Sequence, residues 1–189
     1  MNDTLTSGTA LIAKNIFDNN FKIELNWRVA DLGCGTMAFF SIEAARRVGS
    51  KGLVYAVDIQ KQVLATVNQL AKTQGFYNIE TIWSDVEIVG ATMIENESCD
   101  AVLLVTTLYQ LTDKASAIKE AVRLLKPNGH LLIIDWRTNN APIAPESSRL
   151  VDVNQIKDVI NNSGLEIVNE FEPTNYHFGM VVKKPLANN

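Results

Sequence analysis

The stretch from Val29 to Gly35 constrains the fold of this chain more than any other segment. It reads Val-Ala-Asp-Leu-Gly-Cys-Gly, an apolar run that stops at Asp31 and continues into Gly33 and Gly35. The run predicts a buried strand, and the two glycines predict a tight turn whose backbone a ligand can approach closely. Apolar residues at helical spacing over 39–48 predict that the turn leads into a helix. A strand, a glycine turn and a helix in this order are typical of a nucleotide-type binding site.

Acidic residues also end the next two predicted strands. Asp58 follows Val-Tyr-Ala-Val and Asp85 follows Ile-Trp-Ser, at equal intervals along the chain from Asp31. Thr106 and Trp136 end two later predicted strands. Ligands of open α/β sheets bind beyond the carboxyl ends of the strands, so we expect these five residues to converge on one crevice.

The rest of the chain alternates between strand and helix patterns. The first five expected strands cover 28–32, 53–58, 79–83, 100–105 and 130–135. The expected helices cover 9–20, 39–48, 60–73, 112–125 and 153–163, with Lys-Pro-Asn-Gly ending the fourth. Residues 86–98 are expected to be irregular or briefly helical. Two final strands, 165–171 and 176–183, lie too close together for a helical crossover, so the last must be antiparallel. The pattern predicts an α/β fold with a doubly wound, mostly parallel sheet.

The 189 residues are expected to form a single domain. We divide it into a helical segment over 1–26, a cofactor-binding core over 27–136, and a loop, helix and terminal hairpin over 137–189. The net charge of −4 argues against a nucleic-acid partner, and no apolar run is long enough to predict an integral membrane segment. The N-terminal residues lack a secretory signal pattern. Cys34 and Cys99 are expected to be reduced thiols of a cytoplasmic protein, and no metal site is predicted.

The three strand-end carboxylates predict which nucleotide the site takes. Asp58 can accept hydrogen bonds from two ribose hydroxyls, and Asp85 can accept one from an adenine amine while Val86 packs on the base. Asp31 would repel a pyrophosphate and attract a ligand with a cationic amino-acid end. The residues therefore favour S-adenosylmethionine over a dinucleotide, although Gly33-x-Gly35-x-x-Ala38 also fits the loose dinucleotide pattern.

With these motifs the chain resembles the class I S-adenosylmethionine-dependent methyltransferases. The matching segments are Val29–Thr36, Val54–Ile59, Ser84–Val86, Asp100–Val105 and Leu124–Asp135. Within that family the chain is most similar to the small ubiquinone/menaquinone-type domains, whose acceptors are mostly small molecules. The resemblance implies a Rossmann-like sheet of seven strands in the order 3-2-1-4-5-7-6, with strand 7 antiparallel. The family has a third glycine where Met37 stands, so Met37 is expected either to crowd the cofactor or to pack under the loop.

The predicted activity is methyl transfer from S-adenosylmethionine to a small organic acceptor. The expected cofactor-binding residues are Asp31, Gly33, Gly35, Asp58, Ile59, Asp85, Val86 and Thr106. Four residues near the same edge of the sheet are expected to face the acceptor, with no catalytic base singled out: Tyr109, Trp136, Arg137 and His177. Little chain remains to form a lid, so any lid is expected from 1–26 or 137–151. A short lid implies either an open site for a bulky or partner-presented substrate, or closure by the second subunit of a homodimer.

Two alternatives to this activity stay open. An NAD(P)-dependent oxidoreductase is disfavoured by Asp31 and by the lack of a Tyr-x-x-x-Lys pair after the fourth strand. A non-catalytic methyltransferase-like module is kept open by Met37 and by the lack of an obvious base. Asp58 and Asp85 also have a purely structural interpretation, in which each side chain caps the helix that follows it.

Overall fold

Seven strands form one sheet in the computed structural model, which describes residues 3–140 and 144–186. The strands are β1 (Arg28–Leu32), β2 (Leu53–Asp58), β3 (Ile79–Trp83), β4 (Cys99–Val105), β5 (Leu125–Trp136), β6 (Glu166–Thr174) and β7 (His177–Lys183). Their order is β3-β2-β1-β4-β5-β7-β6, and β7 runs antiparallel to both of its neighbours. The order and the antiparallel last strand are the ones expected, so the predicted fold class is confirmed.

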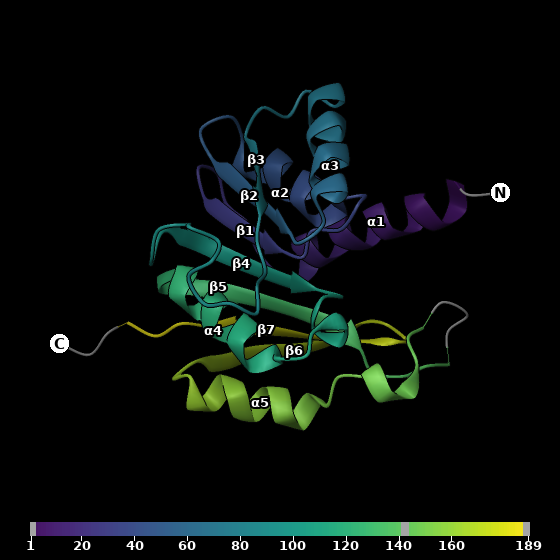
Figure 1. Cartoon of the computed structure of the whole chain (residues 1–189), viewed down its shortest axis with the longest axis vertical. Coiled ribbons are helices and arrows are strands. Elements are labelled where there is room, and N and C mark those ends of the chain that lie inside the picture. Colours follow the sequence, from purple (N-terminus) through teal and green to yellow (C-terminus); the bar gives the residue numbers. More distant parts are fainter. Residues whose placement is uncertain (1–2, 141–143, 187–189) are drawn as a thin grey trace.

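Helices cover both faces of this sheet (Figure 1). They are α1 (Asp3–Asn19), α2 (Phe39–Val48), α3 (Lys61–Thr73), α4 (Lys114–Leu124) and α5 (Val153–Asn162), with short 3-10 turns η1 (Leu108–Gln110) and η2 (Ser147–Arg149). Helices α1 to α3 share one apolar core, and α4 and α5 share the other. The central strand β4 supplies both, because alternate side chains point to opposite faces: Ala101 and Leu103 to the first, Val102 and Leu104 to the second.

Four elements differ most from the sequence prediction in their boundaries: α1, α4, β5 and β6, which ends at Thr174 instead of residue 171. Helix α1 begins at Asp3 instead of residue 9, and α4 is the shorter Lys114–Leu124, with the Asp113 side chain accepting a hydrogen bond from the Ser116 amide as its N-cap. Strand β5 begins at Leu125 instead of residue 130. The pairing with β4 skips from Leu125 to His130 at this point, so Lys-Pro-Asn-Gly is an irregularity within a strand and not a separate turn.

The segment from Val86 to Ser98 has neither helix nor strand, so it is irregular. A buried carboxylate on α4 fixes this segment. Glu120, which is fully buried, accepts hydrogen bonds from the Gly90 amide (2.7 Å), from Thr92 Oγ1 (2.5 Å) and from Arg123 Nε (2.8 Å). The irregular segment is therefore attached to α4 through Glu120.

Within the described residues, no helix combines the length and the apolar character needed to cross a membrane.

Candidate cofactor and acceptor site

The glycine turn after β1 is fixed by backbone hydrogen bonds to β2. The amides of Gly33 and Cys34 both donate to the Val57 carbonyl, at 2.8 and 2.9 Å. The amide of Gly35 donates to Asp58 Oδ2 at 3.2 Å. Gly33 and Gly35 have φ angles of 82° and 65°, which glycine adopts without steric cost. The two strand ends and the turn thus form one rigid unit.

The two glycines serve different purposes in this turn. A Cβ on Gly33 would lie only 2.6 Å from both Cγ2 and Oγ1 of Thr107, whose hydroxyl donates to the Leu32 carbonyl at 3.0 Å. A Cβ on Gly35 would have no atom within 4 Å. Close packing against Thr107 therefore requires a glycine at position 33, which the sequence interpretation missed. Of the two glycines, only Gly35 has open space where a ligand could approach.

A cavity of about 350 Å³ lies on the β2 and β3 side of this turn. Six of the residues expected to bind the cofactor line it: Gly33, Gly35, Asp58, Ile59, Asp85 and Val86. Sequence reasoning missed the other residues that line it, among them Thr107 and Gln110, which follow β4. No local sequence pattern marks Thr107 or Gln110 as a site residue. Each lies beside the cavity only because the sheet order places β4 next to β1.

Asp58 and Asp85 each accept a hydrogen bond from the backbone that follows them, but neither caps a helix: the N-cap of α3 is Gln60, and 86–98 contain no helix. Asp58 accepts from the Gln60 amide through Oδ1 (2.9 Å), in addition to the Gly35 amide through Oδ2. Asp85 accepts from the Glu87 amide through Oδ1 at 2.9 Å. An ionised carboxylate has about four lone-pair sites, so one or two backbone donors leave capacity for a ligand.

A second cavity of about 370 Å³ adjoins the first and shares Gly33, Gly35, Thr36 and Gln110 with it. Five other residues singled out from the sequence line it: Asp31, Thr106, Tyr109, Trp136 and His177. Ile12 of α1 and Thr174 of β6 also line it and were not expected. Two adjoining cavities therefore meet at the glycine turn: Asp58 and Asp85 line the first, and Asp31 and the aromatic rings of Tyr109 and Trp136 line the second.

Asp31 is almost completely buried beneath the second cavity. Its Oδ2 accepts a hydrogen bond from Ser41 Oγ at 2.5 Å. Burial raises the pKa of Asp31 to about 6; the Ser41 hydrogen bond opposes this effect, and the nearby negative charge of Asp58 adds to it. A cationic group placed in the cavity beside Asp31 would stabilise the ionised form.

Trp136 and His177 form one wall of the second cavity. They are directly opposite each other in the β5–β7 ladder, and their ring centroids are 4.1 Å apart. His177 Nδ1 lies 2.7 Å from Thr174 Oγ1, which holds the imidazole in place. Burial lowers the pKa of His177, so the ring is neutral near pH 7. Asp135 holds Tyr109 beside this wall, because Asp135 Oδ2 accepts from the Tyr109 amide at 3.2 Å.

Arg137 is not brought to either cavity, contrary to the sequence expectation. Its guanidinium pairs with Glu172 and donates to the Asn175 carbonyl at 3.2 Å, in the turn between β6 and β7. Adjacent residues of an extended chain point to opposite sides, so Trp136 and Arg137 do not share a direction.

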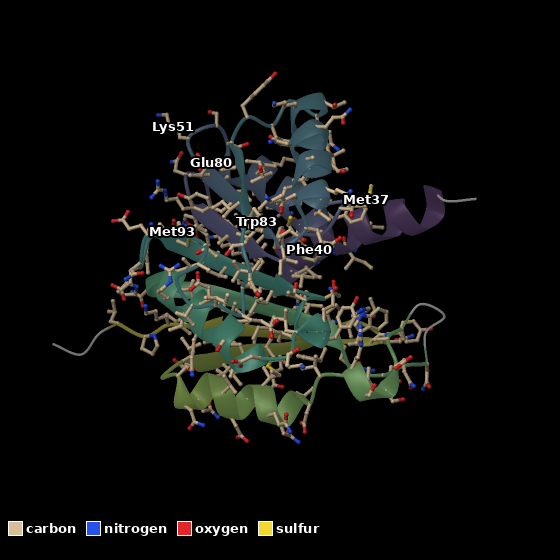
Figure 2. The ribbon with its side chains drawn as sticks, viewed as in Figure 1. Met37, Phe40, Lys51, Glu80, Trp83 and Met93 are labelled. Carbon is tan, nitrogen blue, oxygen red and sulfur yellow. The ribbon has the colours of Figure 1, made fainter. Side chains whose placement is uncertain are left out.

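Met37 stands where the family has a third glycine, and the backbone there does not need one. The left-handed φ falls on the next residue, Ala38, at 45°. The Met37 side chain is 41% exposed and lies near α1 (Figure 2). It lines the second cavity on the side of α1.

Comparison with known proteins agrees with this geometry. A family model described as "Methyltransferase domain" matches residues 23–173. The chain is 34% identical over 111 residues to a 2-phytyl-1,4-naphtoquinone methyltransferase of Trichormus variabilis, covering 58% of this chain and 47% of that protein. It is 25% identical over 177 residues to the ubiquinone/menaquinone biosynthesis C-methyltransferase UbiE of Proteus mirabilis, covering 93% and 67%.

A solved structure shares the whole fold. The SAM dependent methyltransferase from Aquifex aeolicus superimposes with a TM-score of 0.82 at 21% identity, and 95% of each chain is covered. The chain spans between about half and two thirds of the length of the two curated relatives. The family match over most of the chain, together with the confirmed strand order, shows that this protein belongs to the class I S-adenosylmethionine-dependent methyltransferases.

Proposed function

We propose that this chain transfers the methyl group of S-adenosylmethionine to a carbon of a small, reduced quinone in the cytoplasm. The observation that carries the proposal is the pair of adjoining cavities on either side of the glycine turn. One offers carboxylates to a nucleoside, and the other offers an aromatic wall to a flat ring. The shared boundary at Gly33 and Gly35 is where a methyl donor and its acceptor would meet.

The residues around the first cavity fit S-adenosylmethionine. Asp58 would accept from the ribose hydroxyls, and Asp85 and Val86 would hold the adenine. Asp31 lies toward the second cavity and would face the cationic amino-acid end. The open space at Gly35 leaves room for the cofactor to pass over the turn. When bound, the cofactor supplies an activated methyl group, and the protein contributes mainly by orienting the acceptor, an effect that can lower a barrier by about 7–11 kcal/mol.

The second cavity favours a flat, oxygenated acceptor. The Trp136–His177 pair offers a ring face for stacking, and the Tyr109 hydroxyl is available as a hydrogen-bonding group. The names of the two curated relatives, which concern quinones, support the same acceptor class.

His177 would take up the proton that this reaction releases. Replacing a ring hydrogen with the methyl group that the bound cofactor would supply releases one proton from the ring carbon. The neutral imidazole of His177 can accept that proton through Nε2 when Nδ1–H donates to Thr174 Oγ1.

Calorimetric titration with S-adenosylhomocysteine, with NADH in parallel, tests the cofactor. We expect micromolar affinity, about −8 kcal/mol, for the first ligand only. The Asp58→Ala variant should lose at least tenfold in affinity, whereas Asp158→Ala, an exposed carboxylate on α5, should not. If the protein bound NADH and did not bind S-adenosylhomocysteine, the oxidoreductase alternative would be favoured and the proposal would be overturned.

Methyl transfer to chemically reduced 1,4-naphthoquinone, followed by mass spectrometry, tests the acceptor. We expect a C-methylated product, and we expect His177→Gln to lower kcat more than it changes KM. Binding of S-adenosylhomocysteine without turnover of the naphthoquinol would contradict the acceptor assignment and favour the non-catalytic module.

A further inference from the structure

A buried carboxylate that the proposed reaction does not use lies behind the wall of the acceptor cavity. Asp135 precedes Trp136 at the end of β5, its side chain is completely buried, and it lines neither of the two adjoining cavities. In the β5–β7 ladder it lies directly opposite Phe178, an apolar neighbour. A carboxylate is costly to bury unless hydrogen-bond donors face it, so the donors around Asp135 indicate what this residue holds in place.

Backbone amides from two segments of the chain converge on this carboxylate. Asp135 Oδ1 accepts from the Trp136 amide at 2.7 Å, and Oδ2 accepts from the Tyr109 amide at 3.2 Å. The Leu108 amide is a third donor to this side chain. One side chain thus connects η1 to the end of β5, and the aromatic residues of these two segments, Tyr109 and Trp136, both line the acceptor cavity.

The charge on Asp135 determines how strongly the two segments are held together. Hydrogen bonds from amides to an ionised carboxylate are roughly twice as strong as those to a neutral acceptor. Burial raises the pKa of Asp135 to about 6, while the three amides and the charge of Lys114 on α4 oppose this rise. Asp135 is therefore ionised at pH 7 and takes up a proton as the pH falls through about 6, and the link between η1 and β5 weakens over the same range.

Other titratable groups lie near Asp135 and have to be distinguished from it. On η1, Tyr109 has a pKa raised by burial and by the charge of Asp135, with Arg149 of η2 opposing the rise, so it stays neutral at this pH. On β7, His177 has a pKa lowered by burial. Asp31 lines the acceptor cavity from β1, and its pKa is also about 6. A pH dependence of binding alone therefore does not identify Asp135, whereas the amides that donate to it do.

We propose that Asp135 is a positioning residue for the acceptor, whose ionised side chain holds Tyr109 and Trp136 as two fixed walls of one cavity. The inference rests on the proposed function and deepens it, because it makes acceptor binding depend on the charge of a residue that does not touch the acceptor. When Asp135 takes up a proton, η1 loosens from β5 and the aromatic wall loses its shape. Asp58 and Asp85 belong to β2 and to the segment after β3, so the nucleoside end of the cofactor should bind as before.

Amide NMR of the ligand-free protein tests the link directly. The three amide protons that face Asp135 should titrate together with a midpoint near pH 6, and Asp135→Asn should abolish this titration. Asp31→Asn should leave it in place. Asp152→Asn is a matched control, because Asp152 also accepts from two amides but at the start of α5. The absence of such a midpoint in the unmodified protein overturns the proposal even if Asp135→Asn does not fold.

The affinity for 2-methyl-1,4-naphthoquinone, an uncharged probe, tests the consequence for the acceptor. It is measured by calorimetry at saturating S-adenosylhomocysteine. The affinity of the unmodified protein should fall about tenfold between pH 7 and pH 5, because binding that requires the ionised form loses up to about tenfold for each pH unit below the pKa. Asp135→Asn should bind weakly at both pH values, and Asp152→Asn should follow the unmodified protein.

The two measurements separate the role of Asp135 from the identity of the acceptor. Titrating amides without any binding of the naphthoquinone would support the positioning role, and only the quinone assignment would fall. Amides that titrate equally in Asp135→Asn, or an affinity whose pH dependence is unchanged in that variant, would overturn the positioning role and assign the pH effect to Asp31 or His177 instead.

Discussion

Replacing Gly33 by alanine should destabilise the protein because of one close contact. The new Cβ would lie 2.6 Å from Cγ2 and Oγ1 of Thr107, in a backbone with φ of +82°. The left-handed backbone costs an alanine about 1–2 kcal/mol. Overpacking of a buried site costs a further 1–3 kcal/mol or so. The sum, about 2–5 kcal/mol, is a large part of the usual free energy of unfolding of about 5–15 kcal/mol.

Two comparisons separate these contributions. Gly75→Ala introduces a side chain at a similar φ of +77° with no atom within 4 Å, so it should cost only the backbone contribution. Thr107→Ala removes both atoms nearest to the new Cβ, and in that background Gly33→Ala should also cost about 1–2 kcal/mol. Alone, Thr107→Ala should cost about 1 kcal/mol, because it loses the hydrogen bond to the Leu32 carbonyl.

Urea unfolding of the four proteins in the Gly33/Thr107 cycle, with Gly75→Ala alongside, gives the coupling directly. We expect the double variant to be about 1–3 kcal/mol more stable than the summed costs of the two single substitutions would make it. Equal costs for Gly33→Ala and Gly75→Ala, together with zero coupling, would refute the argument that Thr107 excludes a side chain at position 33.

Three further outcomes follow from the site. Ala38→Gly should raise the free energy of unfolding by up to about 1 kcal/mol in urea titrations, because Ala38 has a φ of 45° that glycine adopts more easily. Because burial raises the pKa of Asp31 to about 6, the folded protein holds this proton more tightly than the unfolded chain. Asp31→Asn should therefore stabilise at pH 8 by up to about 3 kcal/mol, with the gain gone below about pH 4, while S-adenosylhomocysteine binds more weakly. Arg137→Ala should change the KM for the naphthoquinol less than about twofold and stability by less than about 1 kcal/mol, since an exposed ion pair contributes little. An unchanged urea midpoint for Ala38→Gly, a pH-independent effect at Asp31, or a large rise in KM for Arg137→Ala would each contradict its own prediction.

The sheet could be predicted because its signals are local. Apolar runs set the strands, and the short link between the last two strands required an antiparallel ending. The order of the strands came from the resemblance to a family, since periodicity alone does not say which strands are neighbours. The start of β5 was missed because Leu125 reads equally well as the last turn of a helix.

The parts of the site that could not be predicted depend on contacts between distant segments. Gly33 and Thr107 come together only after β1 and β4 pair, and Ile12 reaches the acceptor cavity only because α1 packs beside α2. Arg137 was expected at the cavity because it follows Trp136, but its side chain turns to Glu172 in the neighbouring hairpin. Position along the chain indicates which edge of the sheet a residue reaches, and it does not give the direction of its side chain.

Trp136 and His177 face each other as one rung of an antiparallel ladder, and this arrangement limits how the acceptor pocket can diverge. A slip of β7 by one residue against β5 would replace His177 in this rung with a neighbour that points the other way. The register of β7 on β5 should therefore be kept, while point substitutions at the two rung positions remain accessible. New acceptor preferences in such a protein would arise by exchanging side chains on a fixed frame, unlike folds that remodel their pockets through loops of variable length.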